Sequence, residues 1–382
     1  MEQKIKVLHI SPSLSGGGIP TTILSWHRNI ECDKIHFDFI TFADRGSKEF
    51  FTDEVLDYGS KIYYLEGKKN NKRISLVKTF VNLRKILKNN KYDIVHSHLN
   101  GFSVVTLLAA MLSGVKVRIA HSHVSYNNLS LNKRIKKKIL NIGFKCVATC
   151  YCACSKDAGR YLFGDNFVDE NKVHIINNGI DTRKFAYDSH VRDNYRDIFN
   201  LRDNFVIGHV GRFDASKNHN FLIDIFYEIH KKNKDARLIL IGDGEFKSKI
   251  QAKVNDLGIG DFVIFLGVRK DVEKLLQMFD IFVFPSYYEG FGIAILEAQA
   301  AGLRTFVSDY IPREVKVTNL VQFVSLNKNA RYWANKIIEC NTNYNRKNTY
   351  ILIEEVGYDL KSSATHIRNL YYNELKGSKY QS

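Results

Sequence analysis

Short apolar segments that end in a glycine or proline turn recur along the chain, and they constrain its fold more than any other feature. Four successive ones in the second half are Phe205–Val210, Arg237–Ile241, Phe262–Leu266 and Ile281–Phe284. Segments with helical spacing lie between them, and strands that alternate with helices form a parallel sheet covered on both faces. The sequence therefore predicts an α/β fold whose ligands bind at the carboxyl ends of the strands.

The chain of 382 residues is long enough for two domains of ordinary size. Its first half alternates in the same way, with strands expected at Lys4–Ile10, His36–Phe42, Lys61–Leu65, Asp93–His98 and Val115–His121. Residues 181–204 are polar and lack apolar periodicity, so we place the domain boundary there. We expect an N-terminal domain over residues 1–185, a C-terminal domain over residues 186–358 and a final helix within residues 359–382.

The stretch Phe282–Ala301 carries the strongest functional signal. An apolar strand ends at Pro285, Glu289 follows in a glycine turn, and Glu297 falls in the helix expected after Gly292. The first turn of a helix has free backbone N–H groups, which favour anions. The stretch therefore predicts an anion site with one carboxylate in its loop and another about two turns into its helix.

A second glycine turn, Gly16–Gly18, follows the first strand and precedes a helix expected at Thr21–His27. This order has the general form of a phosphate-binding turn. It matches neither the G-x-G-x-x-G spacing nor a P-loop, so a plain flexible turn is an equally good interpretation.

Four histidines, His96, His98, His121 and His123, lie at the ends of two expected strands. The carboxyl ends of parallel strands meet at one edge of a sheet, where ligands bind. A structural role for each single histidine is an equally good interpretation.

Cys150, Cys152 and Cys154 alternate as neighbours on a strand do, and no histidine lies in their run. This is not the spacing of a zinc motif, and we expect small apolar residues on a buried strand, with metal or redox roles as the alternative.

The net charge of +16 is concentrated in residues 1–190, which contain 29 Lys and Arg against 17 Asp and Glu. Within this part, Asn132–Leu140 (NKRIKKKIL) has the pattern of a basic amphipathic helix. Such a helix suits an anionic membrane surface or a solvated face. We expect no nucleic-acid partner, because no aromatic residues are interleaved with the basic ones.

The sequence contains neither a segment apolar enough to span a membrane nor the pattern of a signal peptide. We expect a cytoplasmic protein, and a peripheral location at the inner face of the cell membrane is one alternative for it.

Several motifs together resemble those of a known family. They are GGGIP after the first strand, HSH at His96–His98, RIAHSH at Arg118–His123, NNGID at Asn177–Asp181, GRFDASKNH at Gly211–His219, IGDGE at Ile241–Glu245 and the E-x7-E pair Glu289 and Glu297. The chain resembles the retaining glycosyltransferases of family 4 (glycosyl transferases group 1). The resemblance implies the GT-B fold, with two Rossmann-like domains facing a central cleft and a C-terminal helix that crosses back to the N-terminal domain.

The resemblance also implies roles for residues of the C-terminal half. Arg212 and Lys217 would bind the diphosphate of a nucleotide-sugar donor, and Glu297 would accept hydrogen bonds from its ribose. Glu289, a candidate catalytic residue, would face the hydroxyls of the transferred sugar. The backbone N–H groups of two residues would approach the phosphates, namely Phe291 and Gly292.

In the N-terminal half, His121 matches the histidine that approaches the donor sugar in similar enzymes, and it is the second candidate catalytic residue. His123, two residues away, is an acceptor-side candidate or the true match. Gly17 and Gly18 would allow the donor diphosphate to approach the backbone, and Gly16 is an acceptor-side candidate.

The implied reaction is the transfer, with retention, of a hexose or N-acetylhexosamine from a nucleotide sugar, expected to be a UDP-sugar. The acceptor would be a glycan or a polyprenyl-diphosphate-linked glycan in capsule or exopolysaccharide synthesis, and no metal or other cofactor is expected. The alternatives are a non-hydrolytic sugar-nucleotide-binding protein and a nucleotide-sugar epimerase on the same fold. The segment after Asp309 lacks the glycine-rich turn of many relatives, so the base contacts are not predicted.

Overall fold

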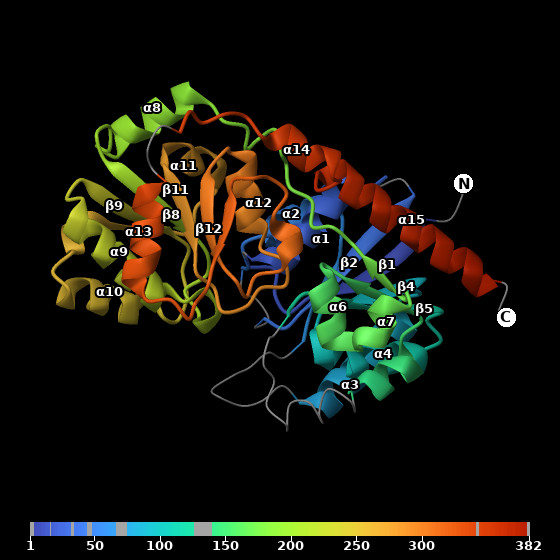
Figure 1. Cartoon of the computed structure of the whole chain (residues 1–382). Coiled ribbons are helices and arrows are strands. Elements are labelled where there is room, and N and C mark those ends of the chain that lie inside the picture. The colour runs from blue at the N-terminus through green and yellow to red at the C-terminus, as the bar shows by residue number, and fades with distance from the viewer. Residues whose placement is uncertain are drawn as a thin grey trace. The chain divides into compact units, whose positions relative to one another are not determined.

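The computed structural model describes residues 4–15, 17–31, 34–43, 48–65, 75–125, 140–340 and 344–379. The chain divides into two compact units (Figure 1). The first contains Met1–Gly179 and Leu360–Ser382, and the second contains Ile180–Asp359. In the described part of the chain, no helix is long and apolar enough to cross a membrane.

The first unit is built on a parallel sheet with the strand order β3-β2-β1-β4-β5-β6-β7. The strands are β1 (Ile5–Ile10), β2 (Ile35–Thr41), β3 (Ile62–Tyr64), β4 (Ile94–Ser97), β5 (Val117–Ser122), β6 (Cys150–Ala153) and β7 (Val173–Ile175). Strand β1 pairs in parallel with both β2 and β4, so the strand order changes direction between β1 and β4. In such sheets a ligand crevice forms at this switch point, beyond the carboxyl ends of the strands.

The helices of the first unit include the last helix of the chain. They are α1 (Gly18–Asn29), α2 (Thr52–Asp57), α3 (Leu76–Asn89), η1 (Asn100–Phe102), α4 (Ser103–Met111), α6 (Lys156–Phe163), α7 (Asp165–Asp169) and α15 (Leu360–Lys379). Helix α15 packs against α1, where Trp26 Nε1 donates a hydrogen bond of 2.8 Å to Ser363 Oγ. Ser363 Oγ in turn donates to the Asn177 carbonyl at 2.6 Å. Tyr371 of α15 is fully buried in the same core as Trp26, which fixes the last helix to the first sheet.

The second unit is built on a parallel sheet with the strand order β10-β9-β8-β11-β12-β13. The strands are β8 (Phe205–Val210), β9 (Ala236–Ile241), β10 (Val263–Gly267), β11 (Ile281–Phe284), β12 (Arg304–Ser308) and β13 (Val321–Val324). Here the switch point lies between β8 and β11, which pair directly through Ile281 and Ile207.

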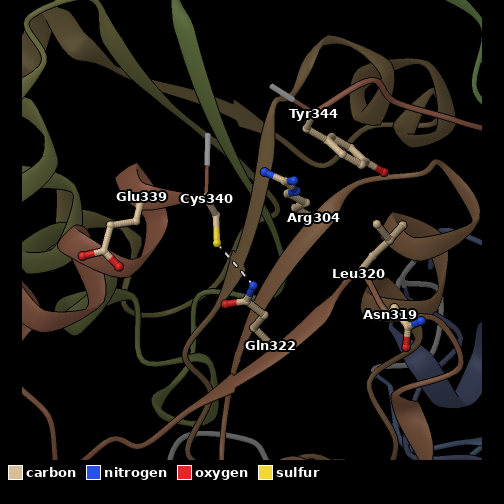
Figure 2. Close-up of a pocket in the computed structure, with 7 residues that line it drawn as sticks. All are labelled: Arg304, Asn319, Leu320, Gln322, Glu339, Cys340 and Tyr344. Atoms are coloured by element: carbon tan, nitrogen blue, oxygen red, sulfur yellow. Dashed lines mark hydrogen bonds between the residues drawn. The ribbon is translucent and has the colours of Figure 1, made fainter. Parts of the chain in front are cut away.

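A pocket of about 420 Å³ lies at the amino ends of β12 and β13 (Figure 2). On one side the Arg304 guanidinium lies 4.3 Å from the centroid of the Tyr344 ring. On the other, Gln322 Nε2 donates to Cys340 Sγ at 3.2 Å. The pocket is therefore at the opposite end of these strands from the edge at which parallel sheets bind ligands.

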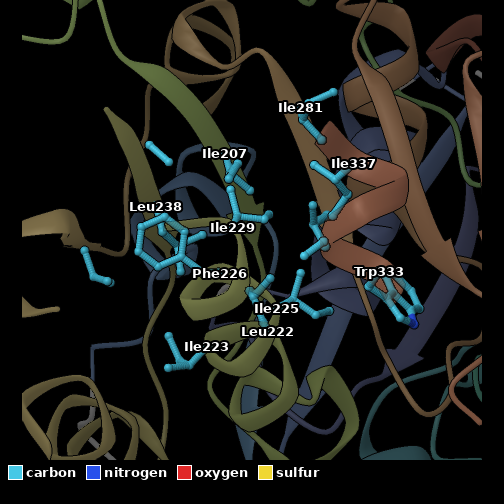
Figure 3. Close-up of a cluster of buried hydrophobic side chains, with 14 of the residues drawn as sticks. Ile207, Leu222, Ile223, Ile225, Phe226, Ile229, Leu238, Ile281, Trp333 and Ile337 are labelled. Carbon is cyan, nitrogen blue, oxygen red and sulfur yellow. The ribbon is translucent and has the colours of Figure 1, made fainter. Parts of the chain in front are cut away.

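Helices complete the second unit. They are α8 (Ser189–Ile198), η2 (Ala215–Lys217), α9 (His219–Lys232), α10 (Lys247–Asp256), η3 (Gly260–Phe262), α11 (Val272–Met278), α12 (Ile293–Ala300), η4 (Arg313–Val315), α13 (Ala330–Glu339) and α14 (Tyr350–Glu355). Leu222, Phe226 and other apolar residues of α9 pack between the strands and α13 to form the core (Figure 3). Trp333 of α13 is fully buried there.

The polar segment 181–204 contains a helix, α8, that apolar periodicity did not predict. Its inward face carries arginines instead of apolar residues. Arg192 and Arg196 both form ion pairs with Asp280, and Arg196 Nε also donates to the Met278 carbonyl at 3.0 Å. At the start of the helix, Asp188 accepts hydrogen bonds from two backbone N–H groups, as a favourable N-cap does.

Residues 180–185, which we assigned to the first domain, lie in the second unit. The Ile180 N–H donates to the Tyr358 carbonyl at 2.9 Å, and Thr182 Oγ1 donates to Glu354 Oε1 at 2.6 Å. These contacts bring both ends of the second unit together, so the chain changes unit at Gly179 and again at Asp359.

Candidate active site

Residues that follow β8 and β11 gather at the switch point of the second sheet. Because these two strands are parallel neighbours, the loops after them start at the same edge. The Tyr287 N–H donates to the Ser216 carbonyl at 2.8 Å, and Asn218 Nδ2 donates to the Pro285 carbonyl at 3.1 Å. Two distant stretches of sequence thus form one connected rim.

Lys217 and Glu289 form an ion pair across this rim. Their side chains are only 17% and 13% exposed, and Lys217 Nζ lies 5.0 Å from the centroid of the Phe284 ring. The structure brings together two residues that the sequence analysis assigned to a phosphate and to a sugar. The ammonium group of Lys217 can bind the phosphates of a nucleotide sugar. The carboxylate of Glu289 beside it can accept hydrogen bonds from the sugar hydroxyls.

Arg212 lies near the start of the same loop but pairs elsewhere. Its guanidinium contacts Asp214 Oδ2 at 2.9 Å, and its side chain is 73% exposed. Burial acts to raise the pKa of Asp214, but hydrogen bonds from Ser216 and Arg212 outweigh burial and lower this pKa below its ordinary value. An exposed ion pair of this kind contributes little, so Arg212 is available to exchange its partner for an anion.

The IGDGE loop, Ile241–Glu245, packs against the backbone of the loop that carries Arg212 and Lys217. Gly242 has φ +133°, and a Cβ atom there would lie 2.1 Å from the Gly211 carbonyl oxygen. The Gly211 N–H donates to the Ile241 carbonyl at 2.9 Å, and the Phe213 N–H donates to the Asp243 carbonyl at 3.0 Å. Only glycine permits this close approach of two backbones.

The loop after Glu289 is fixed by Phe291 and Gly292. The buried Phe291 ring stacks on Tyr358 with 5.0 Å between centroids. Gly292 is the N-cap residue of α12 with φ +101°, a left-handed conformation that favours glycine. The approach of the N–H groups of both residues to a phosphate remains a prediction.

Glu297 lies in α12 in an unusual electrostatic environment. Burial, together with the nearby carboxylate of Glu273, raises the pKa of Glu297 to about 7, and Lys184 opposes this shift. Lys184 Nζ lies 3.5 Å from Glu273 Oε1. The motifs of the sequence identify Glu297 but neither Glu273 nor Lys184, because no motif connects three such distant positions.

Two buried histidines beneath the Lys217 loop were also missed. His209 Nδ1 lies 2.9 Å from the Val283 carbonyl, and the His219 ring stacks on Phe213 at 4.0 Å. Within the described residues, His209 Nε2 and both ring nitrogens of His219 lack a hydrogen-bond partner. His219 is the last residue of the GRFDASKNH motif, but the sequence contains no signal for His209 beyond its position near a strand end.

In the first unit, the structure brings the four predicted histidines together and adds His9 of β1. All five are buried, none being more than 9% exposed. Burial lowers the pKa of each below its ordinary value, so all five are neutral at neutral pH. They lie on β1, on and just after β4, and on and just after β5, at the switch point of the first sheet.

The glycine turn of this unit is described only in part. Gly17 is the N-cap residue of α1, and Gly18 is the first residue of that helix. Within the described residues, a Cβ atom on Gly17 would meet no atom within 4 Å, but the φ of +147° favours glycine here. Gly16 and residues 132–139 of the basic segment Asn132–Leu140 lie outside the described residues.

The three cysteines on and after β6 are buried and free, as the prediction of a buried strand requires. Their spacing suggested no metal motif, yet neighbouring elements supply further ligand atoms. Cys152 lies near His96 and His121, and Cys150 lies near His174 and Glu374, each set within 4.8 Å. Metal independence remains a prediction.

In comparisons with known proteins, each half of the chain matches a glycosyltransferase family model. Residues 16–184 match the family model "Glycosyltransferase Family 4", and residues 191–351 match "Glycosyl transferases group 1". The chain is 31% identical over 373 residues to a Bacillus subtilis (strain 168) protein named "Putative glycosyltransferase EpsF", covering 96% of each chain.

Two further proteins are similar over part or all of the chain. The Escherichia coli UDP-Gal:alpha-D-GlcNAc-diphosphoundecaprenol alpha-1,3-galactosyltransferase is 32% identical over 248 residues, which are 62% of this chain and 64% of the relative. The crystal structure of Anabaena Alr3699/HepE with UDP and glucose superposes with a TM-score of 0.76 at 18% identity, covering 96% of this chain and 99% of that one. Together with the two parallel-sheet units, these matches show that the chain belongs to glycosyltransferase family 4 and has the GT-B fold.

Proposed function

We propose that the protein is a retaining, metal-independent glycosyltransferase that uses a UDP-sugar. It transfers a hexose or N-acetylhexosamine to a glycan or polyprenyl-diphosphate-linked acceptor in the synthesis of a capsule or exopolysaccharide. The observation that carries the proposal is the half-buried pair of Lys217 and Glu289 at the switch point of the second sheet. UDP is favoured because the Escherichia coli relative is named for UDP-Gal and the Anabaena structure contains UDP.

The diphosphate of the donor binds Lys217 and Arg212 in this proposal. Both cations are paired with carboxylates, Glu289 and Asp214, in the structure. The donor phosphates replace these carboxylates as partners of the cations. Glu289 is then available to accept hydrogen bonds from the hydroxyls of the sugar. Two cations offset the charge that develops on the leaving nucleoside diphosphate, which is the task that a metal ion performs in other transferases.

Transfer proceeds on one face of the sugar. The bond from the anomeric carbon to the acceptor oxygen forms as the bond to the phosphate oxygen breaks, and the acceptor hydroxyl gives its proton to the leaving phosphate. No carboxylate is needed as a covalent nucleophile, so the separation rules of glycoside hydrolases do not apply. Glu297 binds the ribose hydroxyls, and His121 contacts the donor sugar.

The acceptor is proposed to be lipid-linked and to be reached at a membrane surface. The Escherichia coli relative is named for a diphosphoundecaprenol acceptor. In the first unit, helix α3 exposes Leu76, Val77 and Val81 to solvent, and the exposed Lys78 and Lys85 belong to the same helix. Exposed apolar residues flanked by lysines suit an anionic lipid surface. If the protein does not bind anionic vesicles at low salt, this part of the proposal is wrong.

A panel of UDP-, GDP- and ADP-sugars tests the donor, because a ligand that binds only the folded protein raises its melting temperature. We expect UDP-sugars to give the largest rise in the wild type and little rise in Lys217→Ala. Incubation with the donor alone separates transferase from epimerase, since an epimerase converts the sugar without an acceptor. Donor binding without transfer to any acceptor, including undecaprenyl-diphosphate-linked sugars, would favour a non-catalytic binding protein.

A further inference from the structure

Five buried histidines and one tyrosine of the first unit form a single chain of hydrogen bonds. They come from four elements that are far apart in the sequence, namely β1, β4, β5 and α15, or directly follow them. The contacts run in order from His121 Nδ1 to His96 Nε2 (3.0 Å), His96 Nδ1 to Tyr371 Oη (2.8 Å), Tyr371 Oη to His9 Nε2 (3.4 Å), His9 Nδ1 to His98 Nε2 (3.0 Å), and His98 Nδ1 to His123 Nε2 (2.8 Å).

Each member of this histidine chain, as we call these six residues, is uncharged. Burial keeps the five imidazoles neutral and keeps the Tyr371 hydroxyl protonated. A neutral imidazole carries one N–H donor and one nitrogen lone pair. Each inner imidazole therefore donates one hydrogen bond along the histidine chain and accepts one. The Tyr371 hydroxyl has a single hydrogen, which it donates to one neighbour while its oxygen accepts from the other.

The donors must consequently all point in the same direction. A reversed member would place two N–H groups, or two lone pairs, face to face and would leave buried polar atoms unsatisfied. Two arrangements remain. In one, His121 Nε2 has a lone pair and His123 Nδ1 carries a hydrogen, and in the other these states are exchanged.

Among the described residues, no group satisfies the outer ring nitrogen at the His121 end of the histidine chain. His121 is fully buried, and its Nε2 has no hydrogen-bond partner among the described residues. The His121 and His123 rings stack with 4.1 Å between centroids, so both ends of the histidine chain lie at the carboxyl end of β5. This is the edge of the sheet at which ligands bind.

The ring nitrogens are spaced for hydrogen bonds and not for a shared metal. Two imidazole nitrogens bound to one tetrahedral zinc, at Zn–N distances of about 2.0–2.1 Å, lie about 3.3 Å apart. The nitrogen pairs of the histidine chain lie 2.8–3.0 Å apart. Every ring nitrogen except the two at the ends is already engaged.

We propose that the histidine chain is a tautomer relay that sets whether His121 Nε2 offers a hydrogen or a lone pair to a hydroxyl of the bound sugar. Reversal of the chain requires one proton to enter at His121 Nε2 and one to leave at His123 Nδ1, or the converse, so no histidine becomes charged. His9, His98 and Tyr371 are thus positioning residues for His121. The link to the sugar, although not the chain itself, rests on the proposed function.

The test perturbs one end of the chain and measures the other. In the full-length protein with ¹⁵N-labelled histidine, NMR reports the ratio of the two tautomers of His121. We expect His123→Gln to change this ratio by about fivefold, the factor that one hydrogen bond supplies. Tyr371→Phe removes a single oxygen at the middle of the chain, and in that background the effect of His123→Gln should vanish.

Ser363→Ala is the matched control, because it removes buried hydrogen bonds of the same helix, α15, outside the histidine chain. In this background the effect of His123→Gln should persist. Equal effects of His123→Gln with Tyr371 and with Phe at that position would overturn the relay, as would no effect in either. One tightly bound zinc ion per protein molecule would also overturn the relay, since the metal would occupy the ring nitrogens.

Transfer rates test the link to function separately. Tyr371→Phe should lower kcat about fivefold while KM for the donor stays within about twofold, and Ser363→Ala should leave both unchanged. An unchanged kcat in Tyr371→Phe would overturn the link to the sugar. A wild-type protein that transfers no sugar would contradict the proposed function instead, and the tautomer measurement would still decide on the chain.

Discussion

Replacing Glu297 by glutamine should stabilise the second unit while weakening donor binding. The pKa of Glu297 rises from an ordinary value of 4.5 to about 7 in the folded protein, mainly through burial and then through Glu273. A raised carboxyl pKa means that folding favours the protonated form. The ionisation of Glu297 therefore destabilises the folded protein. This destabilisation is absent below pH 4.5, grows as pH rises, and is complete above pH 7. Glutamine has nearly the same shape and never ionises.

The size of the effect follows from these two pKa values. Each factor of ten between the folded and unfolded protonation constants is worth about 1.4 kcal/mol. From this difference in pKa, Glu297→Gln should raise the free energy of unfolding by about 3 kcal/mol at pH 8 and by only about 1 kcal/mol at pH 5. The stability of the variant should thus depend less on pH than that of the wild type.

Urea unfolding followed by tryptophan fluorescence measures this difference. The chain has two tryptophans, Trp26 in the first unit and Trp333 in the second, and both are buried. In a Trp26→Phe background, Trp333 alone reports the unfolding of the second unit. The exposed Glu355 of α14 provides the matched control, and Glu355→Gln should leave the unfolding free energy within about 0.5 kcal/mol.

An unchanged stability of Glu297→Gln at pH 8, or a pH dependence equal to that of the wild type, would contradict the raised pKa of Glu297. Affinity should move in the opposite direction to stability, because a neutral amide is a weaker acceptor for ribose hydroxyls than a carboxylate. Tighter binding of UDP-sugar by the variant would contradict the role assigned to Glu297.

Three further predictions concern the same site. Lys217→Ala should lower kcat/KM about 10²–10³-fold, because the charge on the leaving diphosphate loses its partner. Lys247→Ala is the control, since this lysine has only a 3.4 Å contact to Asp243, and it should change steady-state rates little. Similar rates in both variants would count against the site. Gly242→Ala should destabilise the second unit by about 2–4 kcal/mol in urea unfolding, because the new Cβ atom would lie 2.1 Å from the Gly211 carbonyl oxygen. At Gly260 the atom nearest to a new Cβ is 3.5 Å away, so Gly260→Ala should destabilise by at most about 1 kcal/mol. Equal destabilisation by both variants would contradict the close approach at Gly242. UDP-sugar affinity measured by calorimetry should fall about tenfold from pH 8 to pH 6, because the pKa of Glu297 is about 7 and its ionised form accepts the ribose hydrogen bonds. An affinity that is independent of pH would contradict this role of the ionised Glu297.

The parallel sheets could be predicted because their strands are buried on both faces and read as apolar runs. The strands predicted at Phe205–Val210 and Ile281–Phe284 are confirmed at the same residues. Helix α8 could not be predicted in this way, since its buried contacts are made by Arg192 and Arg196 with Asp280. Apolar periodicity does not detect a helix that packs through guanidinium groups.

The residues of the candidate site could be found singly but not as pairs. Lys217 and Glu289 each stood in a recognisable motif, yet their ion pair depends on the pairing of β8 with β11, across more than seventy residues. The pKa of Glu297 depends on Glu273 and Lys184, which belong to no motif. Charge interactions through space follow from strand order, and strand order is not encoded in any single segment.

The histidines show the same limit. Four of them were visible as strand-end residues, but His9 and Tyr371 were not, because the chain of hydrogen bonds requires β1 beside β4 and α15 against both. The prediction that His121 faces the donor sugar, and the choice between His121 and His123, remain predictions.

We propose that this site transfers a sugar with retention. The most direct measurement is the anomeric configuration of the transferred sugar by proton NMR, after incubation with an α-linked UDP-sugar, a polyprenyl-diphosphate-linked acceptor and a metal chelator. Retention gives an α-linked product. A β-linked product, or transfer that stops when the chelator is added, would contradict the proposal.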